Sequence, residues 1–118
     1  MKDKGQEYKK IVICVKMIDV VGGERDMIRI ALLDDEKIVM ARSAEIIAQY
    51  ADEHNEEIET KCYGSSKELK WDLEEQKIYY DIYLLDIELG EDNGLEVAQF
   101  IRKLYPEPFI VFVTSYVK

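Results

Sequence analysis

Four short stretches of the chain have the apolar patterning of β-strands. Three of them are nearly continuous apolar runs, at residues 28–33, 82–86 and 109–113. Runs of this length are typical of strands in a parallel sheet that is covered on both faces. The fourth stretch, at residues 58–63, alternates apolar and polar side chains, as a half-exposed edge strand does. We therefore expect four strands from residue 28 onward.

The first two segments between these strands have the periodicity of helices. Residues 36–53 are rich in helix formers, and either acidic residue of the preceding Asp34-Asp35 pair can cap that helix. A Gly-Ser-Ser turn then begins a second helix that runs to about residue 76. The apolar positions are Met40, Ala44, Ile47 and Ala51 in the first helix, and Leu69 and Leu73 in the second.

A third helix is expected over residues 95–105, before the last strand. Asn93 is a candidate N-cap at the end of a loop, 89–94, that is rich in turn residues. Pro106 and Pro108 end the helix, because proline cannot continue it. The apolar positions step by three, three and four, at Leu95, Ala98, Ile101 and Tyr105.

The resulting order, β-α-β-α-β-α-β, predicts an α/β fold with a parallel sheet and helices on both faces. We expect a doubly wound, flavodoxin-like arrangement of three layers. A domain of that type needs one more strand and helix, whereas the chain ends four residues after Thr114. Residues 27–118 are therefore expected to form a truncated domain that lacks its last strand and helices.

Residues 1–26 have two interpretations. They precede a natural start at Met27, so they can be a translated leader from a mis-assigned first residue. Alternatively, the segment 11–21 is a real additional N-terminal strand, since its content is strand-like. An export signal is disfavoured, because Lys16 and Asp19 interrupt the apolar part and no small-residue cleavage site follows.

Composition narrows the class of function. The chain has 118 residues, enough for one domain, and a formal net charge of −9. That charge disfavours direct contact with nucleic acid or an anionic membrane, since both need a basic face. No stretch approaches the roughly 18 apolar residues of a membrane span. Cys14 and Cys62 lack metal-ligand spacing, so we expect reduced thiols in a cytoplasmic protein.

Polar side chains stand at the carboxyl ends of the three apolar strands. Asp34 and Asp35 follow the first, Asp86 ends the second, and Thr114 follows the third. Open α/β sheets bind ligands at this edge. Adjacent carboxylates are costly to hold together without a cation, and Mg²⁺ prefers such oxygen ligands combined with phosphate oxygens. The pattern predicts a magnesium and phosphoryl site, with Asp86 as nucleophile and the Thr114 hydroxyl bound to a phosphoryl oxygen.

Each of these signals has a simpler explanation when it is taken alone. An acidic pair after a strand is often only a helix cap, and a strand-end aspartate is often solvated. Their joint occurrence at successive strand ends favours a site. Other side chains indicate structure instead: His54 an exposed helix end, and Trp71 with the tyrosines at 79, 80 and 83 packing or rim positions.

The chain resembles the receiver domain of two-component response regulators over residues 28–118. Within the family, two short sequences are most similar to regulators with a LytTR-type DNA-binding domain: DIELG, which starts at Asp86, and GLEVA, at the start of the third helix. The motifs that carry the resemblance are the Asp34-Asp35 pair, Asp86 in the sequence LLDIEL, the Asn93-Gly94 turn and Thr114-Ser115.

The resemblance implies a role for each site residue. Asp86 would accept a phosphoryl group from a sensor histidine kinase. Asp34, Asp35 and Asp86 would hold Mg²⁺, and Glu88 would add its backbone carbonyl. Thr114 would contact the phosphoryl group and shift on activation. Such a domain is a phosphoryl acceptor rather than an enzyme, with at most slow self-dephosphorylation.

The resemblance also implies features that lie around the site. Glu88 and Tyr116 occupy the two variable positions that tune dephosphorylation in this family. A DNA-binding output for transcription regulation would lie outside this chain, and a homodimer stays open. Gly90 stands where proline is common, and the family's fifth-strand lysine is absent, so full switching is not expected. Lys16 lies in a segment that loosely resembles that strand.

Two other functions remain as alternatives. The first is a degenerate receiver that docks to partners without phosphorylation. The second is a magnesium-dependent phosphatase of the haloacid-dehalogenase type, which normally needs an aspartate two residues after the nucleophile, where this chain has Glu88. A calcium loop starting at Asp86 is excluded, because Glu91 stands in place of the required glycine and Val97 in place of the glutamate.

Overall fold

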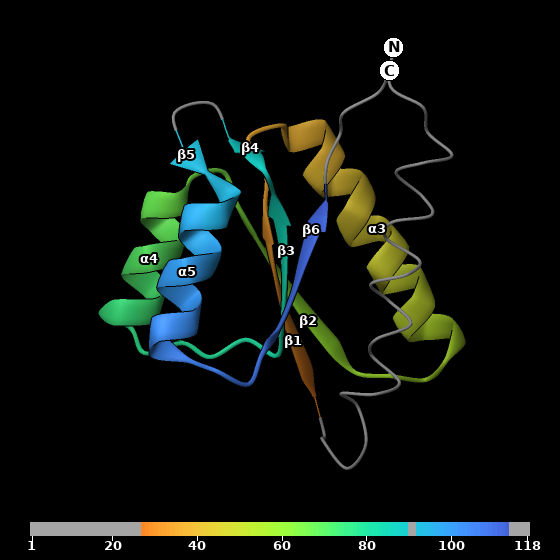
Figure 1. Cartoon of the computed structure of the whole chain (residues 1–118). Coiled ribbons are helices and arrows are strands. Elements are labelled where there is room, and N and C mark those ends of the chain that lie inside the picture. Colours follow the sequence, from red (N-terminus) through yellow and green to blue (C-terminus); the bar gives the residue numbers. More distant parts are fainter. Residues whose placement is uncertain (1–26, 90–91, 114–118) are drawn as a thin grey trace.

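The computed structural model describes residues 27–89 and 92–113, which contain a four-stranded parallel sheet between layers of helices (Figure 1). The strands lie in the order β2-β1-β3-β6, and each neighbouring pair is parallel. This confirms the predicted α/β class and its parallel sheet. The strands of this sheet are β1 (Ile28–Leu33), β2 (Ile58–Tyr63), β3 (Ile82–Asp86) and β6 (Phe109–Val113).

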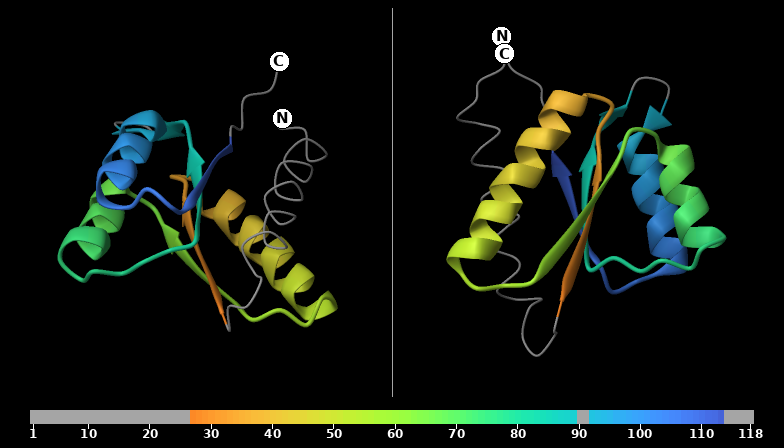
Figure 2. Two further views of the ribbon diagram at one scale, coloured as in Figure 1. Left: turned by 60° about the horizontal axis from the view of Figure 1, so that its bottom comes forward. Right: turned by 180° about the vertical axis from the view of Figure 1, so that it is seen from behind.

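Helices cover both faces of the sheet, as Figure 2 shows. Helix α3 packs on one face and helices α4 and α5 pack on the other. Side chains alternate across a strand, so β1 contributes to two cores: Ile30 and Leu32 lie with α3, whereas Ala31 and Leu33 lie with α4 and α5. The helices are α3 (Lys37–Glu53), α4 (Ser66–Glu74) and α5 (Gly94–Leu104).

The strand order sets where a ligand can bind. The chain moves from β1 outward to β2 and then returns across β1 to β3, so the direction of winding reverses between β1 and β3. Open α/β sheets bind ligands at the carboxyl ends of strands next to such a reversal. The residues that follow β1 and end β3 are therefore in the position that the sequence predicts for a site.

The helix caps confirm one prediction and correct another. Asn93 caps α5 as predicted, since its side-chain oxygen accepts the Leu95 N–H at 2.8 Å. The predicted cap of α3 is wrong: the N-cap is Glu36, and its side chain makes no capping hydrogen bond. Asp34 accepts the N–H of Glu36 itself at 2.8 Å, so its carboxylate stays at the sheet edge rather than on the first turn. Helix α4 ends at Glu74, slightly before the predicted end.

The loop between β3 and α5 differs from the prediction in two ways. Two-residue strands β4 (Glu88–Leu89) and β5 (Asp92–Asn93) pair antiparallel, where an irregular loop was expected. Leu95, predicted on the apolar side of α5, is 49% exposed. Ile101 is buried as predicted, but the buried face of α5 runs through Gly94, Val97 and Ile101, which leaves Leu95 outside it.

The remaining structural predictions concern the aromatic residues, membrane spans and the ends of the chain. Tyr80 and Tyr83 are buried packing residues, and Trp71 is a rim residue that is 58% exposed. Among the described residues, no helix is long and apolar enough to cross a membrane. Residues 1–26, 90–91 and 114–118 lie outside the described part, so the two interpretations of the N-terminal segment stay predictions.

Candidate magnesium and phosphoryl site

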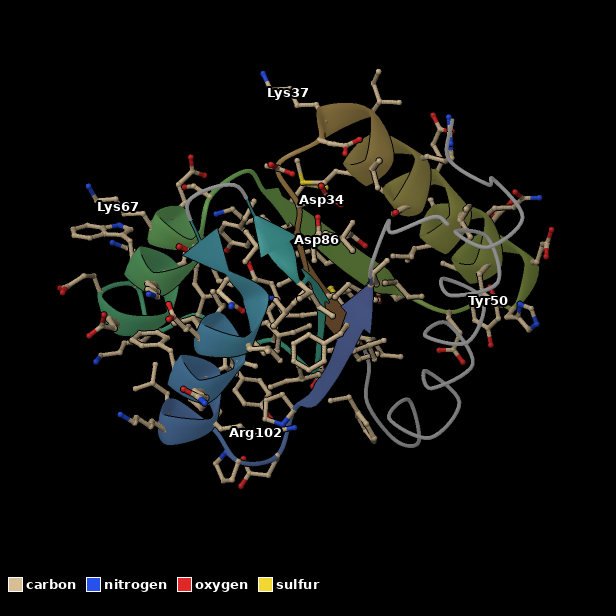
Figure 3. All side chains as sticks on the ribbon, turned by 45° about the horizontal axis from the view of Figure 1, so that its top comes forward. Asp34, Lys37, Tyr50, Lys67, Asp86 and Arg102 are labelled. Carbon is tan, nitrogen blue, oxygen red and sulfur yellow. The ribbon has the colours of Figure 1, made fainter. Side chains whose placement is uncertain are left out.

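Three predicted site residues come together at the carboxyl edge of the sheet. Asp34 and Asp35 follow β1, and Asp86 is the last residue of the adjacent strand β3. Carboxylate oxygens of the three side chains all lie within 4.8 Å of one another. Figure 3 shows Asp34 and Asp86 close together at this edge. The parallel pairing of β1 and β3 produces this convergence, because it aligns the ends of the two strands.

The three carboxylates differ in their exposure. Asp34 is 8% and Asp86 4% exposed, whereas Asp35 faces solvent. The Asp34 backbone N–H donates to the Tyr63 carbonyl of β2 at 3.2 Å, and its side chain accepts the Glu36 N–H. Asp34 is thus held by hydrogen bonds at both its backbone and its side chain. The neighbouring Asp35 is exposed, so a ligand can approach the site from that side.

The electrostatics of the site favour a cation. The pKa of Asp34 is raised to about 6, chiefly by burial. The negative charges of Asp86, Asp35 and Glu36 also act to raise this pKa, and the hydrogen bond from the Glu36 N–H acts to lower it. A raised carboxyl pKa means that the ionised form is unfavourable in the metal-free protein. A bound cation would reverse this, since it compensates both the burial and the mutual repulsion of the carboxylates.

Gly94 contributes to the site although it carries no side chain. Its backbone N–H donates to the Ile87 carbonyl at 3.0 Å, and a β-carbon there would lie 2.2 Å from the Asp86 carbonyl oxygen. The first turn of α5 can therefore pack directly on the backbone of the predicted phosphoryl acceptor only because this residue is glycine. The sequence marked Gly94 as part of a turn and did not indicate this contact.

A small apolar cavity of about 20 Å³ lies beside Asp34 and Asp86, on the α3 side of the sheet. Apolar walls lower the local dielectric constant, which strengthens the interaction between a bound cation and the carboxylates. The wall residues of this cavity are Leu32, Leu33, Val39, Met40, Ser43, Leu84 and Val113.

Two predicted site residues stay less defined. Val113, the residue before Thr114, pairs with Asp86 across β3 and β6. Thr114 itself lies outside the described residues. The backbone of Glu88 follows Asp86 by two residues and pairs with Asn93. The roles of Thr114 and of the Glu88 carbonyl therefore remain predictions.

The donor set fits magnesium. It consists only of oxygen ligands, it carries up to three negative charges within a few ångströms, and its exposed side leaves room for water. Mg²⁺ is typically bound by one or two carboxylates together with waters and phosphate oxygens. The residues present are thus suited to a magnesium ion that shares its coordination sphere with a phosphoryl group.

Comparisons with curated proteins place this chain among signalling proteins. The sequence profile of the response regulator receiver domain matches residues 30–118. The sensory transduction protein LytT of Bacillus anthracis is 36% identical over 91 residues, which cover 76% of this chain and 34% of that protein. LytR of Streptococcus mutans is 32% identical over 88 residues, covering 74% of this chain and 34% of that protein. The chain spans about a third of the length of these relatives.

Solved structures give the same result for the fold. A CheY-like receiver domain from Methanospirillum hungatei has a TM-score of 0.60 at 23% identity, covering 78% of this chain and 67% of that one. A chain in the complex of histidine kinase ThkA with response regulator TrrA has a TM-score of 0.56 at 32% identity, covering 78% and 72%. Fold, profile match and relatives agree, and the chain belongs to the response regulator receiver domain family.

Proposed function

We propose that Asp86 accepts a phosphoryl group from a sensor histidine kinase, with Mg²⁺ bound by Asp34, Asp35, Asp86 and the backbone carbonyl of Glu88. The observation that carries the proposal is the meeting of three carboxylates within 4.8 Å at the reversal point of a receiver-type sheet. If Asp34 and Asp35 only capped a helix, there would be no reason for the Asp86 carboxylate to lie beside them.

In the proposed reaction, an Asp86 carboxylate oxygen attacks the phosphorus atom of a phosphohistidine. The new O–P bond forms as the N–P bond breaks, and the electron pair of that bond returns to the imidazole nitrogen. The bound Mg²⁺ would neutralise charge on the phosphoryl oxygens and on the carboxylates. Gly94 and the end of β3 hold the Asp86 backbone in place, so the acceptor oxygen is positioned before the donor arrives.

The chain acts in this proposal as a phosphoryl acceptor and not as an enzyme. Asp86 is 4% exposed, which limits the access of water to an acyl phosphate and fits slow self-dephosphorylation. Thr114 would contact the phosphoryl group, and Tyr116 would screen it from water. Both roles come from the resemblance to the family.

A histidine kinase is the proposed partner. Among the similar structures is a complex of a histidine kinase with a response regulator, which supports this class of partner. Ile38, the second residue of α3, is 74% exposed beside the acidic edge. A phosphoryl donor has to approach this rim, so an exposed apolar side chain there is available for contact with it. We therefore place Ile38 in the kinase-docking surface.

The signal would pass to an output domain beyond residues 1–118. The relatives named LytT and LytR are about three times as long as the matched region, which leaves room for such a domain. We propose a DNA-binding output that regulates transcription in the cytoplasm, as the LytTR resemblance implies. The chain itself has a net charge of −9 and would not contact DNA.

The test is incubation of the full chain with acetyl phosphate and Mg²⁺, followed by intact-mass measurement. We expect an adduct of about 80 Da, the mass of one phosphoryl group, in the wild type and none in Asp86→Asn. Asp81→Asn is the matched control, since Asp81 is a buried aspartate directly before β3, at the opposite end of the strand from Asp86. A folded wild-type protein without the adduct would support the docking module instead.

A further inference from the structure

Four polar side chains form a hydrogen-bond network between β2, α4 and the segment before β3. Asp72 of α4 accepts hydrogen bonds from Lys61 Nζ at 2.6 Å and from the Tyr63 hydroxyl at 2.5 Å. The hydroxyls of Tyr63 and Tyr80 are 2.6 Å apart. Both tyrosines are fully buried, and Asp72 is nearly so. We call Lys61, Tyr63, Asp72 and Tyr80 the tyrosine–aspartate network.

The charge on Asp72 fixes the direction of these hydrogen bonds. Burial acts to raise the pKa of Asp72, but the hydrogen bonds from Lys61 and Tyr63 outweigh it and lower the pKa. An ionised carboxylate only accepts hydrogen bonds, so the Tyr63 hydroxyl donates its one proton to Asp72. Tyr80 must then donate to the Tyr63 oxygen. The Tyr63 ring is therefore held at its far end by two partners.

Tyr63 connects this network to the acidic site. It is the last residue of β2, and its backbone carbonyl accepts the Asp34 N–H at 3.2 Å. That bond extends the β1–β2 pairing by one residue, to the point where Asp34 leaves the sheet. Gly64 follows Tyr63, and a β-carbon placed there would meet nothing within 4 Å, so no side-chain packing at this residue restrains the peptide. The anchored Tyr63 side chain is therefore one of the restraints on the direction of the Tyr63 carbonyl.

We propose that the tyrosine–aspartate network positions Asp34 for cation binding by holding the Tyr63 carbonyl that accepts the Asp34 N–H. This role rests on the proposed function, because it concerns the Mg²⁺ site. Removal of the Tyr63 hydroxyl leaves the sheet in place but lets the peptide after Tyr63 rotate. Asp34 then spends less time in the orientation that a cation requires.

The expected loss of Mg²⁺ affinity is modest, because the network contacts Asp34 only through a backbone hydrogen bond. Loss of a residue that orients a metal ligand typically weakens metal binding by about 10- to 100-fold. The network acts through a backbone hydrogen bond, so we expect a smaller effect, about 3- to 10-fold, for Tyr63→Phe and for Asp72→Asn. Lys61 is half exposed, and Lys61→Met should therefore have the smallest effect of the three variants.

The test combines two measurements on the full chain. The first is the Mg²⁺ Kd from isothermal titration calorimetry. The second is the hydrogen-exchange rate of the Asp34 amide, measured by NMR in the Mg²⁺-free protein. In Tyr63→Phe, exchange should accelerate at Asp34 but not at Ala31, in the middle of β1, because a general loss of stability would accelerate both.

A matched control comes from the other edge of the sheet. Asp81 is also a buried aspartate, and its carboxylate accepts a backbone N–H, that of Arg29, at 2.9 Å. Asp81→Asn should leave the Mg²⁺ Kd within about twofold of the wild type, since it is distant from the site.

The outcomes separate this proposal from the proposed function. Wild-type Mg²⁺ affinity in Tyr63→Phe and Asp72→Asn, or equal weakening by Asp81→Asn, would overturn the positioning role and leave the proposed function intact. If the wild-type chain bound no Mg²⁺, the proposed function would fail. The exchange rate at Asp34 would then decide alone whether the network holds this residue: a rate unchanged in Tyr63→Phe overturns the proposal, and a selective acceleration supports it.

Discussion

Replacing Gly94 by alanine tests whether the start of α5 holds Asp86 in place. The added β-carbon would lie 2.2 Å from the Asp86 carbonyl oxygen and 3.0 Å from both the Asp86 carbonyl carbon and the Ile87 Cα. All three are backbone atoms, so no change of rotamer relieves the overlap. Ordinary contact begins at 3.4 Å, so the helix and the end of β3 must separate by about 1.2 Å.

Two opposing terms set the cost of this substitution. Inserting a carbon into a packed contact costs about 1–3 kcal/mol. Replacing glycine by alanine stabilises by about 0.4–1 kcal/mol through the unfolded chain where the site tolerates it. We expect a net destabilisation of about 1–2 kcal/mol. A displacement near 1 Å at a reacting group can reduce a rate by about 100-fold, so phosphorylation of Asp86 by acetyl phosphate should slow by about 10- to 100-fold.

Urea denaturation followed by circular dichroism measures the stability, and the time course of the phosphoryl adduct measures the rate. Gly64→Ala is the matched control, because a β-carbon at Gly64 meets nothing within 4 Å. It should be neutral or slightly stabilising. The reasoning would be refuted if Gly94→Ala were as stable as Gly64→Ala and accepted the phosphoryl group at the wild-type rate.

Four further predictions follow from the same structure. The folded-state pKa of Asp34 is raised from 3.8 to about 6, so the metal-free protein should lose at most about 3 kcal/mol of stability as the pH rises between these values. Urea denaturation from pH 4 to 7 should show this loss in the wild type and not in Asp34→Asn. The affinity for Mg²⁺ should decrease when the pH falls below about 6. Asp81→Ala should destabilise the protein by about 1–3 kcal/mol in the same assay, because it removes the buried acceptor of the Arg29 N–H. A loss below about 0.5 kcal/mol would contradict the importance of that bond. Ile38→Glu should slow transfer from a histidine kinase without changing the rate with acetyl phosphate, and equal slowing with both donors would argue against docking. Tyr116→Ala should shorten the lifetime of the phosphorylated protein, and an unchanged lifetime would remove Tyr116 from that role.

The sequence predicts the sheet well because its strands are continuous apolar runs with distinct ends. The predicted strands at residues 28–33, 58–63, 82–86 and 109–113 match the structure. Their parallel pairing then brings the strand-end residues Asp34 and Asp86 together, so the acidic cluster follows from topology. The periodicity of the apolar residues and the positions of the strand ends are thus enough to predict the sheet and the acidic cluster.

The features that the sequence does not predict depend on contacts between distant residues. The antiparallel strands β4 and β5 have two residues each, too few for a periodic pattern. The prediction that Leu95 faces inward is wrong, because the buried face of α5 includes Gly94, which packs on the Asp86 backbone, and periodicity alone does not indicate that contact. The hydrogen bonds of Tyr63 to Asp72 and Tyr80 join residues 9 and 17 positions apart, and no local pattern marks them.

The central claim, that Asp86 is the phosphoryl acceptor, is tested most directly by locating the phosphoryl group. The chain is incubated with acetyl phosphate and Mg²⁺, treated with borohydride to reduce any aspartyl phosphate, and digested for tandem mass spectrometry. We predict that the reduced residue is Asp86 and that chelation of Mg²⁺ during incubation prevents its formation. A modified residue other than Asp86, or modification that is independent of Mg²⁺, would contradict the account.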